Sequence, residues 1–159
     1  WYKVHKPVEY YAAYFTVRSE NLDGAIAMQG HKAVRDKMNN IKQKQSVHEA
    51  TAKDEAEYQT LQIVNEMMAR KIEFLPVDIY KSEAKMFKVE DGKIRLPFSS
   101  LPGVGGAAAD SLAETGKHTE YLSIEDMQIK TKVTKAVIET LKDVGVLNNL
   151  PESSQMSLF

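Results

Sequence analysis

The chain has 159 residues, 43% of them hydrophobic, so it is long enough to bury a core and corresponds to about one domain. Its 21 basic and 22 acidic side chains leave a formal charge of −1, which excludes a nucleic-acid binder that relies on bulk positive charge. The lack of cysteine excludes disulfides and thiolate metal sites, and no apolar run approaches the roughly 18 residues of a membrane-spanning helix.

The first 15 residues follow a helical pattern. Large apolar side chains recur there at three- and four-residue steps, which predicts a helix with one buried face. These side chains are Trp1, Val4, Val8, Tyr11 and Phe15. Pro7 suits a first helical turn, where its fixed backbone angle and missing N–H are tolerated. The Asp23-Gly24 pair then predicts a turn.

Two more helices are expected before residue 72. The first runs from about residue 25 or 31 to about residue 42, and a polar segment with a domain boundary follows it up to about residue 52. The second runs from about residue 54 to residue 70, with acidic side chains in its first turn, where the helix dipole favours them. The expected inward-facing residues are Val34, Met38 and Ile41 in the first helix and Leu61, Val64, Met68 and Ile72 at the second.

The first of these two helices also carries Lys32, Arg35 and Lys37. Such a basic face could lie along nucleic acid. Solvated lysines are the commoner explanation of this pattern.

The spacing of the apolar residues changes after residue 71. Residues 72–79 form a short apolar run broken by Pro76, which favours an edge strand or an extended connection. Residues 86–89 and 94–96 then flank Asp91-Gly92, a pair that strongly favours a two-stranded hairpin. A small β-hairpin therefore precedes the next segment.

The segment Leu101-Pro102-Gly103-Val104-Gly105-Gly106, followed by three alanines, carries the main functional signal. Two glycines one residue apart let the backbone turn sharply and leave amide N–H groups pointing outward. The helix that follows would add its own free N–H groups and its positive dipole end. This combination predicts a helix-hairpin-helix motif, which holds a sugar-phosphate backbone without reading bases. The expected DNA contacts are Gly103, Val104, Gly105 and Gly106.

Two other interpretations of this segment stay open. Gly103-x-Gly105-x-x-Ala108 also fits the dinucleotide-binding fingerprint, which needs a buried parallel strand before it. Pro97 and Pro102 disfavour such a strand. A purely structural glycine turn is the other alternative.

The remaining helices predict a second, glycine-free hairpin. One helix is expected to end at Thr115-Gly116, the next to run from a Ser123 cap to about Thr131, and the last from residue 135 to residue 144 before Gly145. The expected inward-facing residues of the last helix are Val137, Ile138 and Leu141. Residues 131–134 would form the second hairpin, and the expected phosphate contacts there are Lys130, Lys132, Thr134 and Lys135.

The chain finishes with Gln155-Met156-Ser157-Leu158-Phe159 after a spacer that begins at Pro151. Adjacent Leu and Phe in a polar tail favour insertion into a partner's pocket. The alternative is that the tail folds back on its own domain.

These features together resemble a known family. Gln155-x-x-Leu158-Phe159 is similar to the motif by which bacterial replication proteins dock on the sliding β clamp. The whole chain resembles the C-terminal end of PolC-type DNA polymerase III α subunits. This resemblance is based on the glycine turn and the tail, together with residues 10–15, 74–79 and 148–151.

The resemblance implies a mainly α fold with a small β-hairpin, in which fingers-type helices precede a tandem helix-hairpin-helix domain. Residues 1–52 would end the fingers-like region, 53–72 would be a connecting helix, 73–150 the duplex-binding domain and 151–159 a flexible clamp-binding tail. The implied clamp contacts are Gln155, Met156, Ser157, Leu158 and Phe159. The implied partners are primer-template duplex, the sliding clamp and the rest of the polymerase chain, in the bacterial cytoplasm at the replisome and away from membranes.

The implied activity is that of a DNA-directed DNA polymerase, a nucleotidyltransferase. Its palm aspartates and their Mg²⁺ ions would lie upstream of Trp1, so we expect no catalytic residue and no cofactor in these 159 residues. The scattered His5, His31, His48 and His118 are not expected to bind metal. A freestanding helix-hairpin-helix accessory or repair protein with a clamp motif is the alternative function.

Overall fold

The computed structural model describes residues 1–18 and 21–153. The helices are α1 (Tyr2–His5), α2 (Pro7–Val17), α3 (Gly24–Met28), α4 (His31–Ser46), α5 (Ala52–Ala69), α6 (Gly106–His118), α7 (Ile124–Thr131) and α8 (Lys135–Asp143). The strands are β1 (Phe74–Leu75), β2 (Lys88–Glu90) and β3 (Lys93–Arg95), and a short 3₁₀ helix, η2, covers Phe98–Ser100. The predicted fold class, mainly α with a small β element, is confirmed.

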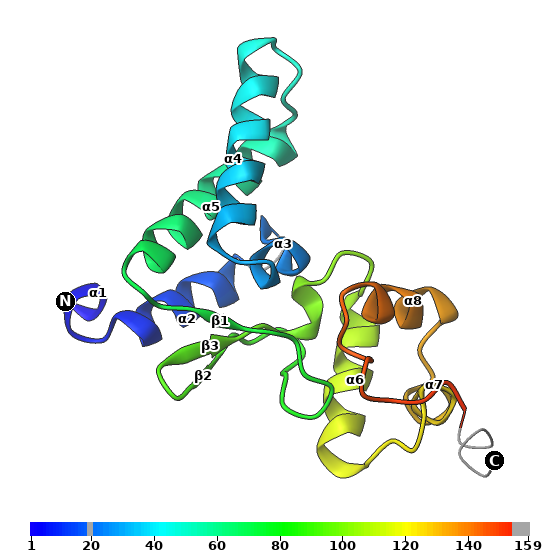
Figure 1. The fold of residues 1–159 in the computed structure, drawn as a ribbon. Helices are drawn as coiled ribbons and strands as arrows, with labels where there is room; N and C mark the ends of the chain where they lie inside the picture. The colour runs from blue at the N-terminus through cyan, green and yellow to red at the C-terminus, as the bar shows by residue number, and fades with distance from the viewer. Residues whose placement is uncertain (19–20, 154–159) are drawn as a thin grey trace.

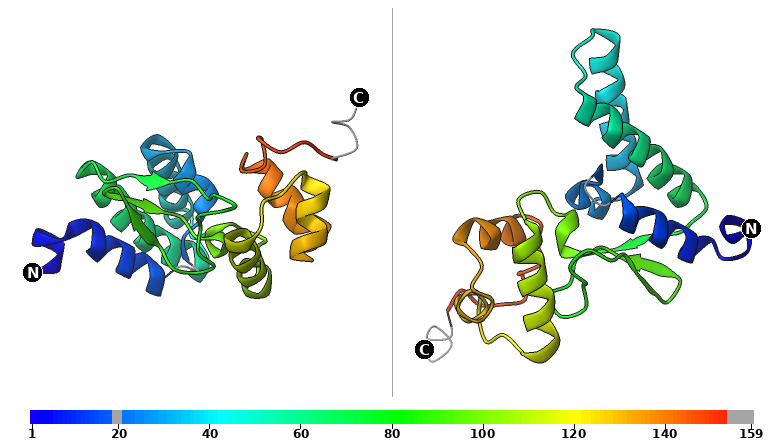
Figure 2. Two further views of the ribbon diagram at one scale, coloured as in Figure 1. Left: turned by 90° about the horizontal axis from the view of Figure 1, so that it is seen from below. Right: turned by 180° about the vertical axis from the view of Figure 1, so that it is seen from behind.

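The elements form three groups in space (Figures 1 and 2). Helices α4 and α5 pack side by side as an arm that projects from the rest of the molecule. Helix α2 and the small sheet occupy the middle, and α6, α7 and α8 are grouped at the end opposite the N-terminus.

The N-terminal helical pattern is interrupted, which corrects one prediction. Tyr11 and Phe15 are fully buried as expected, but Trp1 is 76% exposed and Val4 is 73% exposed. The cause lies at Lys6, whose non-helical backbone (φ −135°, ψ 65°) separates α1 from α2. The apolar steps therefore belong to two helices, and only the second of them turns its apolar face to the core.

The arm formed by α4 and α5 is longer than predicted. Helix α4 continues to Ser46 rather than ending near residue 42, and α5 begins at Ala52 after a short connection. Thr51 and Asp54 close a reciprocal capping box at the start of α5. Buried side chains join the two helices to the core, and they include Val34, Ile41, Leu61, Val64 and Met67.

The sheet has the order β1-β3-β2, with β1 at an edge as the proline in its flank predicted. Strand β1 pairs with β3 in parallel, and β2 pairs with β3 in antiparallel register. Asp91 (φ 51°) and Gly92 (φ 76°) form the two-residue turn between β2 and β3. Both angles are positive, as the hairpin turn predicted from Asp-Gly requires.

Helix α6 corrects a second prediction. It does not end at Gly116 but continues to His118. The backbone carbonyl of Ile79 lies against Gly116, in space that any side chain at this position would need. This glycine therefore permits a close approach of two chain segments and does not stop the helix.

The last two helices occupy the predicted segments, and a side-chain hydroxyl caps the start of each. Ser123 accepts a hydrogen bond from the N–H of Asp126 at the start of α7, and Thr134 accepts one from Val137 at the start of α8. Gly145, at φ 84°, follows the end of α8. The inward face of α8 is buried through Val137, Ile138 and Leu141.

Candidate nucleic-acid interface

The first hairpin is a tight turn anchored at both ends. The N–H of Val104 donates to the carbonyl of Leu101 at 3.2 Å, and Gly103 occupies the third position of this turn with φ 91°. A positive φ at that position, after a proline, is the geometry of a type II turn. Leu101 and Val104 are 1% and 7% exposed, so their side chains hold the turn to the core.

The backbone that follows this turn is open to solvent. Gly103, Gly105 and Gly106 are exposed, and Gly105 is the N-cap of α6 with no side chain to cap it. The first hydrogen bond of the helix runs from Ala109 to the carbonyl of Gly105. Within the described chain, the N–H groups of Gly106, Ala107 and Ala108 have no acceptor. These amides and the positive end of the α6 dipole form a surface suited to an anion.

Val104 differs from its neighbours among the predicted DNA contacts. Its side chain is turned into the core, so it supports the turn rather than facing a ligand. The signal for the hairpin was local, since Pro102 and the glycines specify the turn by themselves.

A segment that sequence reasoning missed supports the hairpin. We call residues 78–86 the strap; it lies beside α6 (Figure 1). The carbonyls of Glu83 and Ala84 accept hydrogen bonds, both 3.0 Å long, from Phe98 and Ser99 of η2. The buried Ser82 hydroxyl donates to the carbonyl of Leu96 at 2.8 Å. The strap therefore fixes the chain immediately before the first hairpin.

The second hairpin connects α7 to α8 through three residues. Lys132 takes the left-handed conformation (φ 60°), Val133 is buried, and Thr134 caps α8. Lys132 and Lys135 are exposed and make no ion pair with any residue in the described ranges. Their ammonium groups are available to a phosphate.

Lys130 is in a different situation. Its Nζ lies 2.9 Å from Oδ2 of Asp126 and 3.3 Å from the carbonyl of Glu120. The N–H of Leu122 and then the Lys130 ammonium lower the pKa of the Asp126 carboxyl below its ordinary value. Lys130 is thus already paired within the protein, which makes it a weaker candidate for a phosphate contact than Lys132.

The two hairpins belong to one packed unit. A side-chain carbon added at Gly103 would lie 3.2 Å from Oγ1 of Thr140, on α8. The first turn therefore rests against the last helix of the second hairpin. This contact fixes where one hairpin lies relative to the other.

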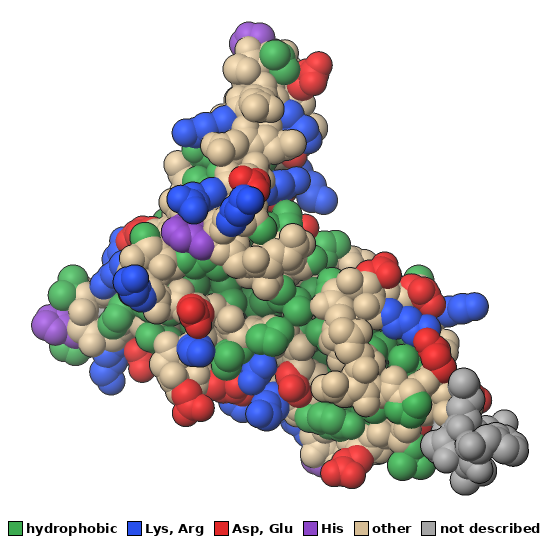
Figure 3. All heavy atoms as spheres, viewed as in Figure 1, with side chains coloured by type: hydrophobic (Ala, Val, Ile, Leu, Met, Phe, Trp, Pro, Cys, Tyr) green, Lys and Arg blue, Asp and Glu red, His purple; other side chains and the backbone are tan. Residues whose placement is uncertain are grey.

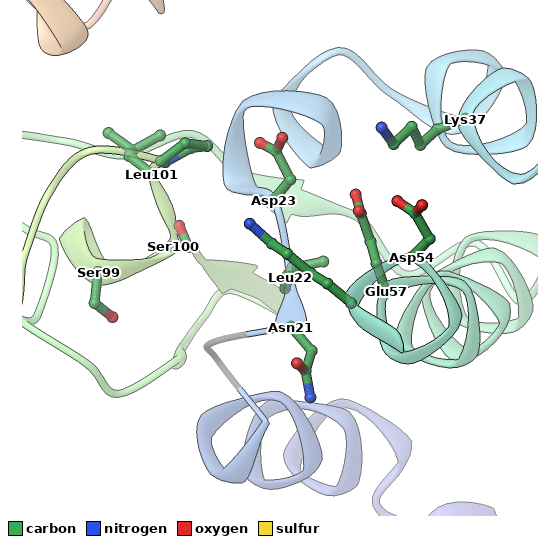
Figure 4. A pocket seen from close by; sticks show the side chains of 11 residues that line it. Asn21, Leu22, Asp23, Lys37, Asp54, Glu57, Ser99, Ser100 and Leu101 are labelled. Atoms are coloured by element: carbon green, nitrogen blue, oxygen red, sulfur yellow. The ribbon is translucent and has the colours of Figure 1, made fainter. Parts of the chain in front are cut away.

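A pocket of about 380 Å³ lies on another side of the first hairpin (Figure 4). Ser99 and Ser100 of η2 and Leu101 of the first hairpin line one side of it. Asp23, before α3, and Asp54 and Glu57 of α5 also line it, together with Lys37 and Lys53. Burial raises the pKa of the Glu57 carboxyl, and the nearby Lys37 ammonium opposes this shift. Asp23 caps α3 and Asp54 completes the capping box of α5, so these two carboxylates have structural roles.

Basic side chains gather over the α4–α5 arm (Figure 3). Two of them have partners within the arm. The Lys42 ammonium lies 5.9 Å from the centre of the Tyr58 ring, and Lys44 Nζ lies 4.0 Å from Asp54. The nucleic-acid interpretation of this face stays a prediction.

Among the described residues, no cluster of three or more histidine, aspartate or glutamate side chains could hold a metal ion. His31 bonds the Asn65 side chain at 2.5 Å, and His118 pairs with Glu114 at 3.3 Å. No described helix is both long and apolar enough to cross a membrane. The predicted clamp contacts, Gln155, Met156, Ser157, Leu158 and Phe159, lie outside the described residues.

Comparisons with known proteins agree with this geometry. A family model for the helix-hairpin-helix motif matches residues 71–156. The whole chain is similar to proteins named DNA polymerase III PolC-type, at 37% identity in Thermotoga maritima and 41% in both Clostridium perfringens and Halalkalibacterium halodurans. The chain spans 11% of the length of each of these relatives.

Proposed function

We propose that this chain, which belongs to the helix-hairpin-helix motif family and is homologous over its whole length to a segment of PolC-type DNA polymerase III, binds duplex DNA through its two hairpins. The observation that carries the proposal is the set of free amides at the start of α6, next to an exposed glycine turn.

Phosphate oxygens of one strand would accept hydrogen bonds from the amides of Gly106, Ala107 and Ala108. Lys132 and Lys135 would contact phosphates of the other strand. Backbone amides and ammonium groups carry no information about bases, so this affinity is independent of DNA sequence. Because the net charge of the chain is only −1, the attraction is local, and each contact matters more than the overall field.

We place this binding within a DNA-directed DNA polymerase of the bacterial cytoplasm. There the chain would hold the primer-template duplex while nucleotidyl transfer takes place elsewhere in the polymerase. The Mg²⁺ ions of that reaction would be held by other parts of the enzyme, and the 159 residues would supply no catalytic group.

The tail supplies the second half of the proposal. Gln155, Leu158 and Phe159 would dock on the sliding clamp. A clamp that encircles the duplex keeps the tethered hairpins at a high effective concentration, so weak duplex contacts suffice. Neither the duplex contact nor the clamp contact then needs to be strong by itself.

Two substitutions at one position test the duplex contact. Gly105 has an extended backbone (φ −76°, ψ 171°), and an added side-chain carbon would meet no atom within 4 Å, so both Gly105→Asp and Gly105→Ala fit. The aspartate carboxylate would cap the free amides and repel phosphate, and we expect duplex affinity at low salt to fall about tenfold or more. Gly105→Ala leaves the amides open and should bind nearly as well as the unmodified chain.

Fluorescence titration with a short labelled duplex measures both variants, and urea unfolding checks that they are folded. We expect the aspartate to leave stability unchanged or to raise it by a few tenths of a kcal/mol. Equal duplex affinity of the Asp and Ala variants would exclude the α6 amides from the interface.

The tail is tested separately. Replacing Leu158 and Phe159 together by alanine should abolish capture of the purified clamp and leave duplex affinity unchanged. Clamp capture that survives this double substitution would remove the tail from the proposal.

A further inference from the structure

A lysine outside both hairpins lies against the first of them. A side-chain carbon added at Gly106 would be 3.7 Å from both Cε and Nζ of Lys85. The ammonium group therefore lies beside the first residue of α6, where the free amides begin. Lys85 is 21 residues upstream of Gly106 and belongs to the strap, so no local motif connects the two residues.

The strap holds the backbone of Lys85 in place. The residues just before Lys85, Glu83 and Ala84, accept backbone hydrogen bonds from η2. Further along α6, the Lys117 ammonium pairs with the Glu83 carboxylate at 2.7 Å, and Gly116 admits the carbonyl of Ile79. Two contacts thus align the strap with α6, the hydrogen bonds to η2 fix its end, and Lys85 lies at the N-terminal end of the helix.

Two positive charges meet at this point, the Lys85 ammonium and the N-terminal end of the α6 dipole. An ammonium group beside the positive end of a helix dipole is unfavourable unless an anion joins them. The nearest acid in the strap, Glu83, is already paired with Lys117. Asp110, one turn further along α6, and every other acid within the described residues make no ion pair with Lys85.

The geometry points to Lys85 as a further DNA-phosphate ligand, which completes the anion site that the α6 amides begin. This inference rests on the proposed function and adds to it a contact from outside the two hairpins. Amides of Gly106 and Ala107 would hold a phosphate by directed hydrogen bonds, and the Lys85 ammonium would neutralise its charge. A lysine is suited to this role because its charge can approach a phosphate from many directions.

The experiment compares charge removal at two exposed lysines. Lys85→Gln removes the proposed contact. Lys93→Gln removes the same charge at the tip of the β2–β3 hairpin, where the lysine pairs with Glu73 at 3.4 Å. An exposed ion pair of that kind contributes little stability, so both variants should fold. Lys85→Arg keeps the charge and tests for rescue.

Duplex affinity is measured over a series of salt concentrations. For Lys85→Gln we expect a loss of about three- to tenfold at low salt and a salt slope that is less steep by about 1, as for one lost phosphate contact. Lys93→Gln should match the unmodified chain in both quantities, and Lys85→Arg should restore the affinity. Urea midpoints should be unchanged in all three variants.

Equal slopes and affinities for Lys85→Gln and Lys93→Gln would overturn this inference while the proposed function stands. Failure of the unmodified chain to bind duplex at low salt would overturn both. If Lys85→Gln loses affinity but Lys85→Arg fails to recover it, the positive charge at residue 85 is not what binds, and the inference is wrong.

Discussion

The two hairpins connect helices in opposite ways. The first uses Gly103 for its left-handed residue and leaves the N-terminus of α6 without a side-chain cap. The second uses Lys132 for its left-handed residue and caps α8 with Thr134. The first therefore presents bare backbone to solvent, and the second presents side chains.

This difference has an energetic side. A good N-cap contributes about 1 kcal/mol to a helix, and a glycine cap comes close to it without occupying the amides. A left-handed lysine carries backbone strain of about 1 kcal/mol that a glycine avoids. The first hairpin is thus relaxed and open, whereas the second keeps a strained residue that carries a charge. The proposed binding through backbone at one hairpin and through side chains at the other is based on this contrast.

The largest effect is expected when the first hairpin is given a side chain at its left-handed position. Gly103→Ala combines backbone strain at φ 91° with crowding against Thr140, and we expect a loss of about 2 kcal/mol in the free energy of unfolding. Gly92→Ala is the matched control, since it has a similar φ of 76° and meets no atom within 4 Å. It should lose about 1 kcal/mol, the usual cost of a side chain in the left-handed region.

Urea unfolding gives both values, and a duplex titration adds the functional comparison. Only Gly103→Ala should weaken duplex binding, because Gly92 lies in the β2–β3 turn, away from both hairpins. The same loss of affinity in the two variants would mean that general destabilisation, and not the shape of the first turn, governs binding.

An intermediate effect is expected at the capped hairpin. Thr134→Ala removes the hydrogen bond from Val137 to the Thr134 hydroxyl, which is 3.3 Å long, and should cost about 1 kcal/mol of stability. Thr134→Ser keeps a hydroxyl in place and serves as the control. The difference between the urea midpoints of the two variants measures how much the Thr134 cap contributes to stability. A midpoint for Thr134→Ala equal to that of Thr134→Ser would show that the second hairpin does not depend on its cap.

Features that depend on neighbouring residues could be predicted from the sequence. Asp91-Gly92 specifies its turn, Ser123 specifies a helix start, and the glycine turn specifies the first hairpin, because each acts on backbone groups within three residues of itself. The same locality explains one error. The apolar steps from Trp1 to Phe15 continue across Lys6, and only Pro7, which becomes the first residue of α2, marks the break in the helix there.

Features that depend on distant contacts could not be predicted. Gly116 carries the usual signature of a helix end, and only the position of the Ile79 carbonyl reveals its true role. Lys85 sits in an unremarkable loop sequence, and only the packing of the strap along α6 brings its ammonium to Gly106. Likewise, the pairing of Lys130 with Asp126 separates it from Lys132, although all the lysines near this hairpin look equivalent in sequence.

The smallest effect is expected when the pairing of Asp126 with Lys130 is removed, and this effect depends on pH. The pKa of Asp126 lies below its ordinary value of 3.8 in the folded protein, chiefly because the N–H of Leu122 donates to the carboxylate and then because of Lys130. Folding therefore favours the ionised form. The resulting stabilisation is fully present above the unfolded value and is lost as the pH falls through the folded value. Asp126→Asn should lose less stability than the unmodified chain on acidification from about pH 5 to about pH 2.

The variant also bears on the contrast between the hairpins. Without its carboxylate partner, Lys130 becomes free to contact phosphate, so duplex affinity at neutral pH should rise slightly. Glu125→Gln removes a carboxylate from the same helical turn and leaves the Lys130 pair intact, so it controls for the change in net charge. Urea midpoints at several pH values and duplex titrations measure both effects. An equal gain in affinity from Glu125→Gln would mean that the change in net charge alone causes the rise. Release of Lys130 from Asp126 would then add no phosphate contact at the second hairpin.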